Sequence, residues 1–174
     1  MKKETIFIPA LILGIVFGAA LSLPAEKDGG KVSLGAGNIL ARKAFSVNIP
    51  SAKFVAETAY VGTVSGRDVD KFAITSLTPV RCEYVDAPYV KEFPLVVECK
   101  VIKTIELGIH TMFIGKIMDV KADKAILGKR NRPDIKKMNP FIFSQGDFGF
   151  YTIGDFLGTI KPLAEKVSPP SKKR

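Results

Sequence analysis

The sequence predicts a mainly β fold of short antiparallel strands with a few short helices. Residues 43–50 ("KAFSVNIP") alternate apolar and polar side chains, the period of a half-buried strand. Two β-rich segments, 94–106 and 108–120, follow each other closely enough to pair. Three prolines break the region 79–94 into extended pieces, which disfavours a helix there.

Length and charge limit the range of architectures and partners. A chain of 174 residues with 47% hydrophobic side chains can bury one sizeable core, so we expect one domain. The net charge of +9 permits attraction to phosphates, anionic cofactors or a membrane surface. Basic residues gather in 121–137 and 161–174, without interleaved aromatic residues. We therefore predict a solvated loop, a basic flexible tail and no nucleic-acid partner.

The N-terminal segment 1–30 is atypical and leaves three alternatives open. Residues 5–25 carry no charge after a basic start, which is typical of a secretory signal. The run is also close to the length of a membrane span, with Gly14 and Gly18 spaced for helix pairing. The third alternative is a buried first strand, followed by a polar hairpin turn at 25–31.

The middle of the chain contains the predicted helices. Strand 43–50 places Phe45 and Val47 on one face and ends at Pro50. Ser51 then caps a helix over 52–62. Residues 65–67 form a turn, and Asp68 caps a second helix over 69–77.

The two cysteines, Cys82 and Cys99, do not indicate a redox or metal site. Two residues cannot build a disulfide framework, and their spacing does not match CxxC. Cys99 lies in the strand-like run 94–102. We therefore predict buried free thiols.

His110 is the only histidine, and it lies inside a run that is apolar on both faces, which predicts a strand covered on both sides. It directly follows Gly108 and Ile109, where a missing side chain lets a backbone or ligand approach. A lone histidine in such a run is more often a core residue than a catalytic one. It cannot form a metal site by itself, and no nucleophile motif accompanies it.

Five motifs in order change that interpretation. They are "ARKAFSVNIPS" (41–51), "VSGRDVDKF" (64–72), "LTPVRCEYVDAPYVKEFPLVVECKV" (77–101), "LGIHTMFIGKIMDVKAD" (107–123) and "FYTIGDFLG" (150–158). In order and spacing they resemble the flavin reductase-like, FMN-binding split-barrel family, in particular its flavoredoxin-type branch. The resemblance covers about residues 37–160 and predicts one such domain over 31–160.

The resemblance implies a fold, a cofactor and partners. The family fold is a six-stranded, antiparallel split β-barrel with Greek-key character, assembled as a homodimer with FMN held non-covalently at the subunit interface. Family members pass electrons from NADH, NADPH or another donor through FMN to a flavin, ferric iron or a protein acceptor. Such chemistry needs few catalytic side chains, because the flavin performs the difficult step.

The resemblance also implies site residues. Matched to "GxHTxFxG", His110 becomes the candidate catalytic side chain, as a hydrogen-bond donor or proton shuttle beside the flavin. The remaining matched motifs supply the candidate FMN-binding residues: Asn48, Ile49, Ser65, Gly66, Arg67, Lys71, Phe72 and Thr111. No metal ligand is expected.

The family's phosphate-binding segment is not visible in this sequence, and two readings follow. In one, the N-terminus is a remodelled strand, the protein is cytoplasmic, and Arg42, Lys43 or the amides of residues 35–37 hold the phosphate. In the other, a signal or anchor over 5–25 replaces the first strands, which predicts a membrane-tethered or exported electron-transfer protein. A degenerate split barrel that binds a ligand without reductase activity is a further alternative.

Overall fold

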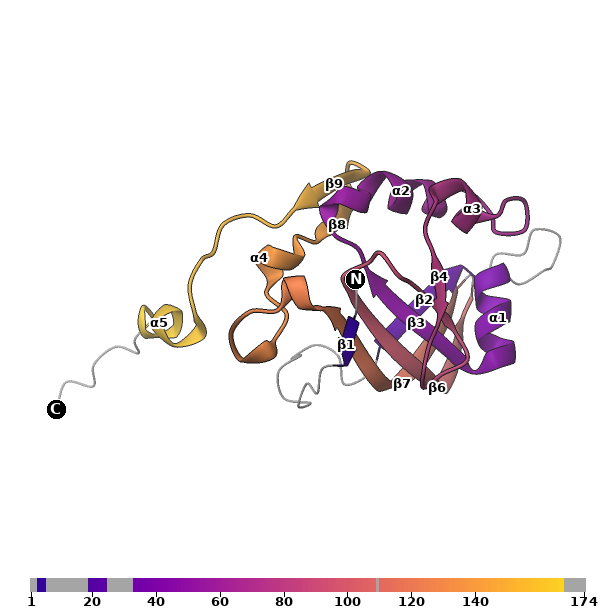
Figure 1. The fold of residues 1–174 in the computed structure, drawn as a ribbon, viewed down its shortest axis with the longest axis horizontal. Coiled ribbons are helices and arrows are strands. Elements are labelled where there is room, and N and C mark those ends of the chain that lie inside the picture. The colour runs from indigo at the N-terminus through magenta and orange to yellow at the C-terminus, as the bar shows by residue number, and fades with distance from the viewer. Residues whose placement is uncertain (1–2, 6–18, 25–32, 109, 168–174) are drawn as a thin grey trace.

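The computed structural model describes residues 3–5, 19–24, 33–108 and 110–167, and its core is an antiparallel sheet (Figure 1). The strands pair in the order β1-β7-β6-β3, and β2 also pairs with β7. Their bounds are β1 Lys3–Thr5, β2 Ala19–Pro24, β3 Ala44–Ile49, β6 Leu95–Leu107 and β7 His110–Asp123. The predicted mainly β, antiparallel fold with a few short helices is confirmed.

The long β6–β7 hairpin is the framework of the molecule. Gly108, with a φ of 70°, lies in its turn, a conformation that glycine adopts without steric cost. Two bulges interrupt the register, and the extra residues are Ile102 in β6 and Met118 in β7. Bulges increase the local twist, which suits a sheet that curves toward a barrel.

The interior of the curved sheet holds the main core. Phe45, Cys99 and Phe113 are buried there, and α1 (Leu34–Arg42) closes it with Ala36 and Ile39. A second cluster, formed by Leu95, Ala122, Ile126 and Met138, lies at the other end of β7. These buried apolar residues share one face of β3, β6 and β7, and their burial stabilises the curved sheet. For β3, the alternation in 43–50 predicts which residues share that face.

The predicted helices exist; Ser51 occupies the predicted N-cap position without a side-chain hydrogen bond, and the predicted Asp68 cap is wrong. Ser51 precedes a 3-10 turn, η1 (Ala52–Phe54), and makes no capping bond; α2 (Val55–Thr63) follows. Helix α3 (Lys71–Thr75) is capped by Asp70, which accepts from the amides of residues 72 and 73 at 3.0 and 3.1 Å. Asp68 instead lies in the 65–69 turn, where its amide donates to a carbonyl.

The proline-punctuated region forms a small separate ribbon over the sheet. Strands β4 (Pro79–Arg81) and β5 (Pro88–Val90) pair with each other. The loop between them contributes Cys82, which is buried against Ala44. Both cysteines are free and buried, as the sequence predicts.

The C-terminal third leaves the barrel. Short elements follow β7: η2 (Lys124–Ile126), η3 (Lys129–Asn131) and α4 (Ile135–Met138). The β8–β9 hairpin (Phe141–Ser144, Gly149–Thr152) follows, and beyond it the chain extends away from the sheet to α5 (Ile160–Glu165) (Figure 1). The prediction of a solvated loop over 121–137 is wrong at Lys121, which is buried. Of the predicted tail, 168–174 lies outside the described residues.

The N-terminal segment takes part in the sheet where it is described. β1 pairs with the end of β7, and β2 pairs with its beginning, from Ala19 opposite Gly115 to Pro24 opposite His110. The strand alternative fits these two pieces. Most of the rest, including the predicted turn at 25–31, lies outside the described residues. Among the described helices, none combines the length and apolar character of a membrane span.

Candidate functional site

His110 begins β7 directly after the turn of the hairpin, where it pairs with Leu107 at the end of β6. Side chains alternate along the strand, so His110, Met112 and Ile114 share the outer face of the sheet, opposite the buried Phe113. The imidazole is half-buried. Its Nδ1 atom is buried and has no hydrogen-bond partner among the described residues. A buried ring nitrogen without a partner is costly, so this atom is suited to a ligand or water.

Thr111 lies on the other face of the same strand. It is 3% exposed, and its hydroxyl donates to Glu106 Oε2 at 3.0 Å. The backbone thus places His110 and Thr111 side by side in sequence but turns their side chains in opposite directions. Of these two residues, His110 is the one that faces the outer side of the hairpin.

Asn48 and Ile49 end β3 and already have partners. The Asn48 Oδ1 atom accepts from the Val90 amide at 2.8 Å, and its Nδ2 donates to Ser46 Oγ at 2.8 Å. The bond from Val90 attaches β5 to the sheet, and the bond to Ser46 lies within β3. Ile49 packs against the second core cluster, at the end of β7 far from His110. The structure therefore does not bring either residue to His110.

The turn formed by Ser65, Gly66 and Arg67 lies against the first turn of α1. A Cβ at Gly66 would lie 3.2 Å from Leu34 Cδ2, so glycine permits this close approach. The Ser65 hydroxyl accepts from the Arg67 amide at 3.1 Å, which holds the turn. The predicted binding turn and the helix N-terminus are therefore neighbours.

Lys71 and Phe72 begin α3, directly after this turn. Lys71 Nζ donates to the Val61 carbonyl at 2.6 Å, which attaches α3 to the end of α2. Phe72 is half-buried, and its amide donates to Asp70. The ammonium group of Lys71 would have to leave its carbonyl partner in order to contact an anion.

The three candidates for holding a phosphate lie at opposite ends of α1. The amides of residues 35–37 are in its first turn, where helix amides favour an anion, but those of Ala36 and Gly37 donate to Ser33, which caps that turn. Arg42 and Lys43 lie at the other end, about 13 Å away for nine residues. Arg42 is paired with Asp86 at 2.5 Å. The helix N-terminus is thus the candidate beside the Gly66 turn.

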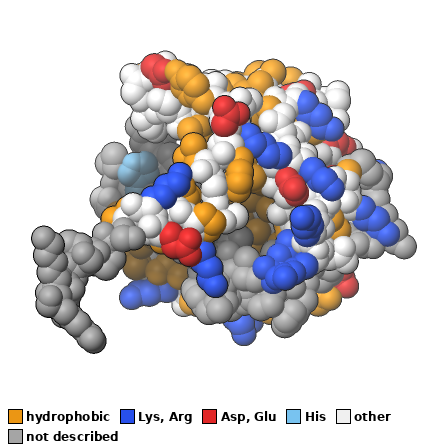
Figure 2. Space-filling view, turned by 90° about the vertical axis from the view of Figure 1, so that its left-hand side faces the viewer, with side chains coloured by type: hydrophobic (Ala, Val, Ile, Leu, Met, Phe, Trp, Pro, Cys, Tyr) orange, Lys and Arg blue, Asp and Glu red, His pale blue; other side chains and the backbone are white. Residues whose placement is uncertain are grey.

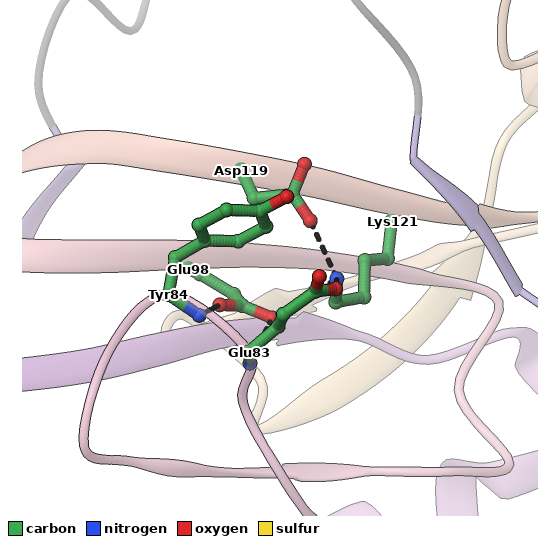
Figure 3. Close-up of polar contacts among 5 residues, drawn as sticks. All are labelled: Glu83, Tyr84, Glu98, Asp119 and Lys121. Carbon is green, nitrogen blue, oxygen red and sulfur yellow. Dashed lines mark hydrogen bonds and ion pairs between the residues drawn. The ribbon is translucent and has the colours of Figure 1, made fainter.

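Sequence reasoning missed a polar cluster on the outer face of the sheet (Figure 3). Lys121 Nζ lies 2.6 Å from Asp119, 3.1 Å from Glu83 and 3.4 Å from Glu98. The fully buried Glu98 also accepts from the amides of Glu83 and Tyr84, at 3.3 and 2.9 Å. The signal was available, because Glu98 and Lys121 are charges placed inside apolar strand sequences.

The cluster has a structural role in the fold. Burial by itself lowers the pKa of Lys121, but hydrogen bonds to Asp119 and Glu83 and the surrounding negative charges outweigh it and raise that pKa. The lysine is therefore charged at neutral pH. Its Nζ also lies 5.4 Å from the centre of the Tyr84 ring. Together these contacts hold the loop between β4 and β5 on the sheet.

Comparison with known proteins assigns the family. The model of the flavin reductase like domain matches residues 29–150. The chain belongs to the flavin reductase-like domain family. Membership supports a flavin-binding redox protein, and it agrees with the motif order, the antiparallel curved sheet and the single histidine at the hairpin.

Solved structures and a curated relative resemble this flavin reductase-like chain. Flavoredoxin of Desulfovibrio vulgaris is 41% identical, with a TM-score of 0.74, covering 83% of this chain and 75% of that one. Flavoredoxin from Methanosarcina acetivorans is 29% identical, with a TM-score of 0.77, covering 86% and 75%. An uncharacterised Archaeoglobus fulgidus protein is 36% identical over 91 residues, covering 52% of this chain and 50% of its own. The chain spans about half the length of the curated relatives it matches.

The residues of this flavin reductase-like domain fit FMN at two places. The Nδ1 atom of His110, to which no described residue is hydrogen-bonded, can exchange a hydrogen bond with a polar ring atom. At the first turn of α1, beside the Gly66 turn, the amides of Ala36 and Gly37 already donate to Ser33, so a phosphate would contact the Gly35 amide or compete with Ser33. A cavity of about 340 Å³ lined by Ser51, Asp123 and Met138 lies elsewhere, at the opposite end of β7.

Proposed function

We propose that this domain binds FMN and transfers electrons from NADH, NADPH or a similar donor to a flavin, ferric or protein acceptor. The observation that carries the proposal is His110, whose buried Nδ1 has no hydrogen-bond partner within the described part of the chain and lies on a half-open apolar face. The family match and the resemblance to two flavoredoxins support it. The bound flavin would supply the redox chemistry.

The chain's own residues would bind and orient the cofactor. His110 would hold a proton or a hydrogen bond at Nδ1, next to the flavin ring. The apolar neighbours Met112 and Ile114 would limit access of water to that face. Amides in the first turn of α1 would hold the phosphate, because a helix N-terminus favours an anion.

The homodimer belongs to the same proposal. The sequence predicts that the strand carrying His110 is covered on both faces, yet its outer face is only half-buried in a single chain. A second copy over this face would exclude water from the flavin. It would also agree with a cofactor held between subunits.

A second candidate function is a degenerate split barrel that binds a ligand without reductase activity. It is favoured by the internal partners of Asn48, Lys71 and Thr111, whose polar atoms are already engaged within the chain. In this case the fold persists while most of the predicted polar contacts serve stability.

The visible absorption spectrum distinguishes the two. Purified protein is mixed with FMN, unbound flavin is removed, and NADH or NADPH is added under anaerobic conditions. A retained flavin spectrum that bleaches supports the reductase. Retained flavin without bleaching by either nucleotide calls for another donor, and no retained flavin under excess FMN contradicts the proposal and favours the degenerate barrel.

A further inference from the structure

The C-terminal arm, residues 141–167, exposes far more apolar surface than a single chain needs. Phe156 is 74% and Leu157 86% exposed. The other exposed large apolar residues of the arm are Ile142, Phe143, Phe148, Phe150, Tyr151, Ile153, Ile160, Leu163 and Val167. In Figure 1 the part of the arm beyond β9 extends away from the sheet, and Figure 2 shows hydrophobic side chains at the surface between charged ones on that side of the molecule.

The area of this surface matches what a stable dimer buries. A large apolar side chain at these exposures offers roughly 100 Å² to a partner, so the arm offers on the order of 1,000 Å². A standard interface needs about 800 Å² from each partner.

A complementary face exists on the same chain. The outer face of the β6–β7 hairpin exposes Ile102, at 66%, together with Leu107 and Met118. Exposed lysines 100, 103 and 116 surround these apolar residues. This outer hairpin face also carries His110, which pairs with Leu107 across the hairpin.

The charges of the two surfaces are opposite in sign. The arm contains three acidic residues (147, 155 and 165) and two lysines (161 and 166), a net charge of −1. Its first twenty residues contain no Lys or Arg. The outer hairpin face instead carries the exposed lysines 100, 103 and 116. Opposite charge around apolar patches steers association and fixes its orientation.

We propose that the arm of one copy docks on the outer hairpin face of a second copy, and the reverse, so that two arms are exchanged about a two-fold axis. The partner's arm then covers the face on which His110 lies and completes the enclosure of that site. The inference rests on the homodimer of the proposed function but not on FMN. Each dimer contains two equivalent arm-to-face contacts.

Paired variants of the full chain test the exchange by sedimentation velocity over a concentration series. The arm variant is Phe156→Ser with Leu157→Ser, and the face variant is Ile102→Ser with Met118→Ser. The matched control is Ile74→Ser, an apolar residue 54% exposed on α3, outside both surfaces. We expect the dimer dissociation constant to rise at least about 100-fold for the arm and face variants and to stay unchanged for the control.

Mixing the arm variant with the face variant gives the decisive result. A heterodimer of the two retains one intact arm-to-face contact, so mixing should restore dimers that neither variant forms alone. A monomeric parent, a dimer insensitive to both variants, or no restoration on mixing would overturn the proposal. Bound flavin is measured in the same samples: an arm-dependent dimer without flavin refutes only the cofactor, and a flavin-binding dimer insensitive to the arm refutes only the exchange.

Discussion

Lys121 Nζ of β7 lies 3.4 Å from the carboxylate of Glu98 in β6, and that carboxylate is fully buried. The two residues occupy neighbouring strands on the outer face of the sheet, beneath the loop between β4 and β5 (Figure 3). Glu98 also accepts two amide hydrogen bonds from that loop. The carboxylate that pairs with Lys121 therefore also joins the sheet to a segment about fifteen residues away in sequence.

Removing the positive charge should therefore destabilise the fold. Lys121→Met leaves Glu98 and Asp119 buried without their cation, and we expect a loss of about 3–5 kcal/mol in the free energy of unfolding. Urea unfolding measures it. Lys116→Met, an exposed lysine on the same strand, should change stability by less than about 0.5 kcal/mol. Equal effects of the two substitutions would contradict the structural role of the cluster.

A side chain at Gly115 should clash with residues of the main core. A Cβ there would lie 2.7 Å from the Phe45 ring and 2.9 Å from Cys99 Cβ, so Gly115→Ala should cost about 1–3 kcal/mol in urea unfolding. Gly37→Ala is the matched control, because nothing lies within 4 Å of its Cβ and alanine favours the helix by up to about 1 kcal/mol. Stabilisation by both substitutions would be inconsistent with this packing.

The cysteines should be unreactive in the folded protein. Burial, followed by the negative charge of Glu98, raises the pKa of Cys82 to about 12 and that of Cys99 to about 11. Both thiols therefore stay protonated at pH 8, and thiolate is the reactive form. Labelling by a thiol reagent should be at least about 100-fold slower than in the unfolded chain. Rapid labelling without denaturant would show that the loop over Cys82 opens readily.

The buried carboxyl group of Asp123 should make the stability of the folded protein depend on pH. It is 1% exposed, and burial raises its pKa above the ordinary 3.8, although the nearby ammonium group of Lys3 opposes the shift. The folded protein thus binds the proton more tightly than the unfolded chain. The resulting stabilisation is fully present below about pH 4 and is lost as the pH rises through the folded pKa.

Asp123→Asn removes this titration. The stability of the variant relative to the parent should therefore increase as the pH rises from 3 toward 7, measured by urea unfolding at several pH values. A relative stability that falls over the same range would mean that the ion pair with Lys3 outweighs burial.

His110→Ala tests the candidate catalytic side chain. We expect flavin reduction by a reduced nicotinamide to slow about 100-fold, or FMN binding to weaken several-fold, because a proton or hydrogen bond at Nδ1 is lost. Stopped-flow absorbance and flavin fluorescence measure the two effects, and circular dichroism checks the fold. Unchanged kinetics and affinity would remove His110 from the mechanism.

The sequence by itself determined the features that depend on neighbouring residues. Alternation over 43–50 predicted β3, and two β-rich runs predicted the β6–β7 hairpin, because side chains of a strand change face at each residue. Motif order was enough to predict the family. Local signals were less exact at the helix starts, where Asp70 rather than Asp68 forms the cap.

Only the tertiary structure decided which polar atoms remain available. Asn48 is engaged by Val90, and Lys121 by Glu83, across 42 and 38 residues of sequence. Such contacts depend on how distant segments pack, and periodicity contains no information about that. The same packing buries Lys121, leaves the Nδ1 of His110 without a partner from any residue the structure describes, and leaves the arm exposed, because burial is a property of the assembled surfaces rather than of any local stretch.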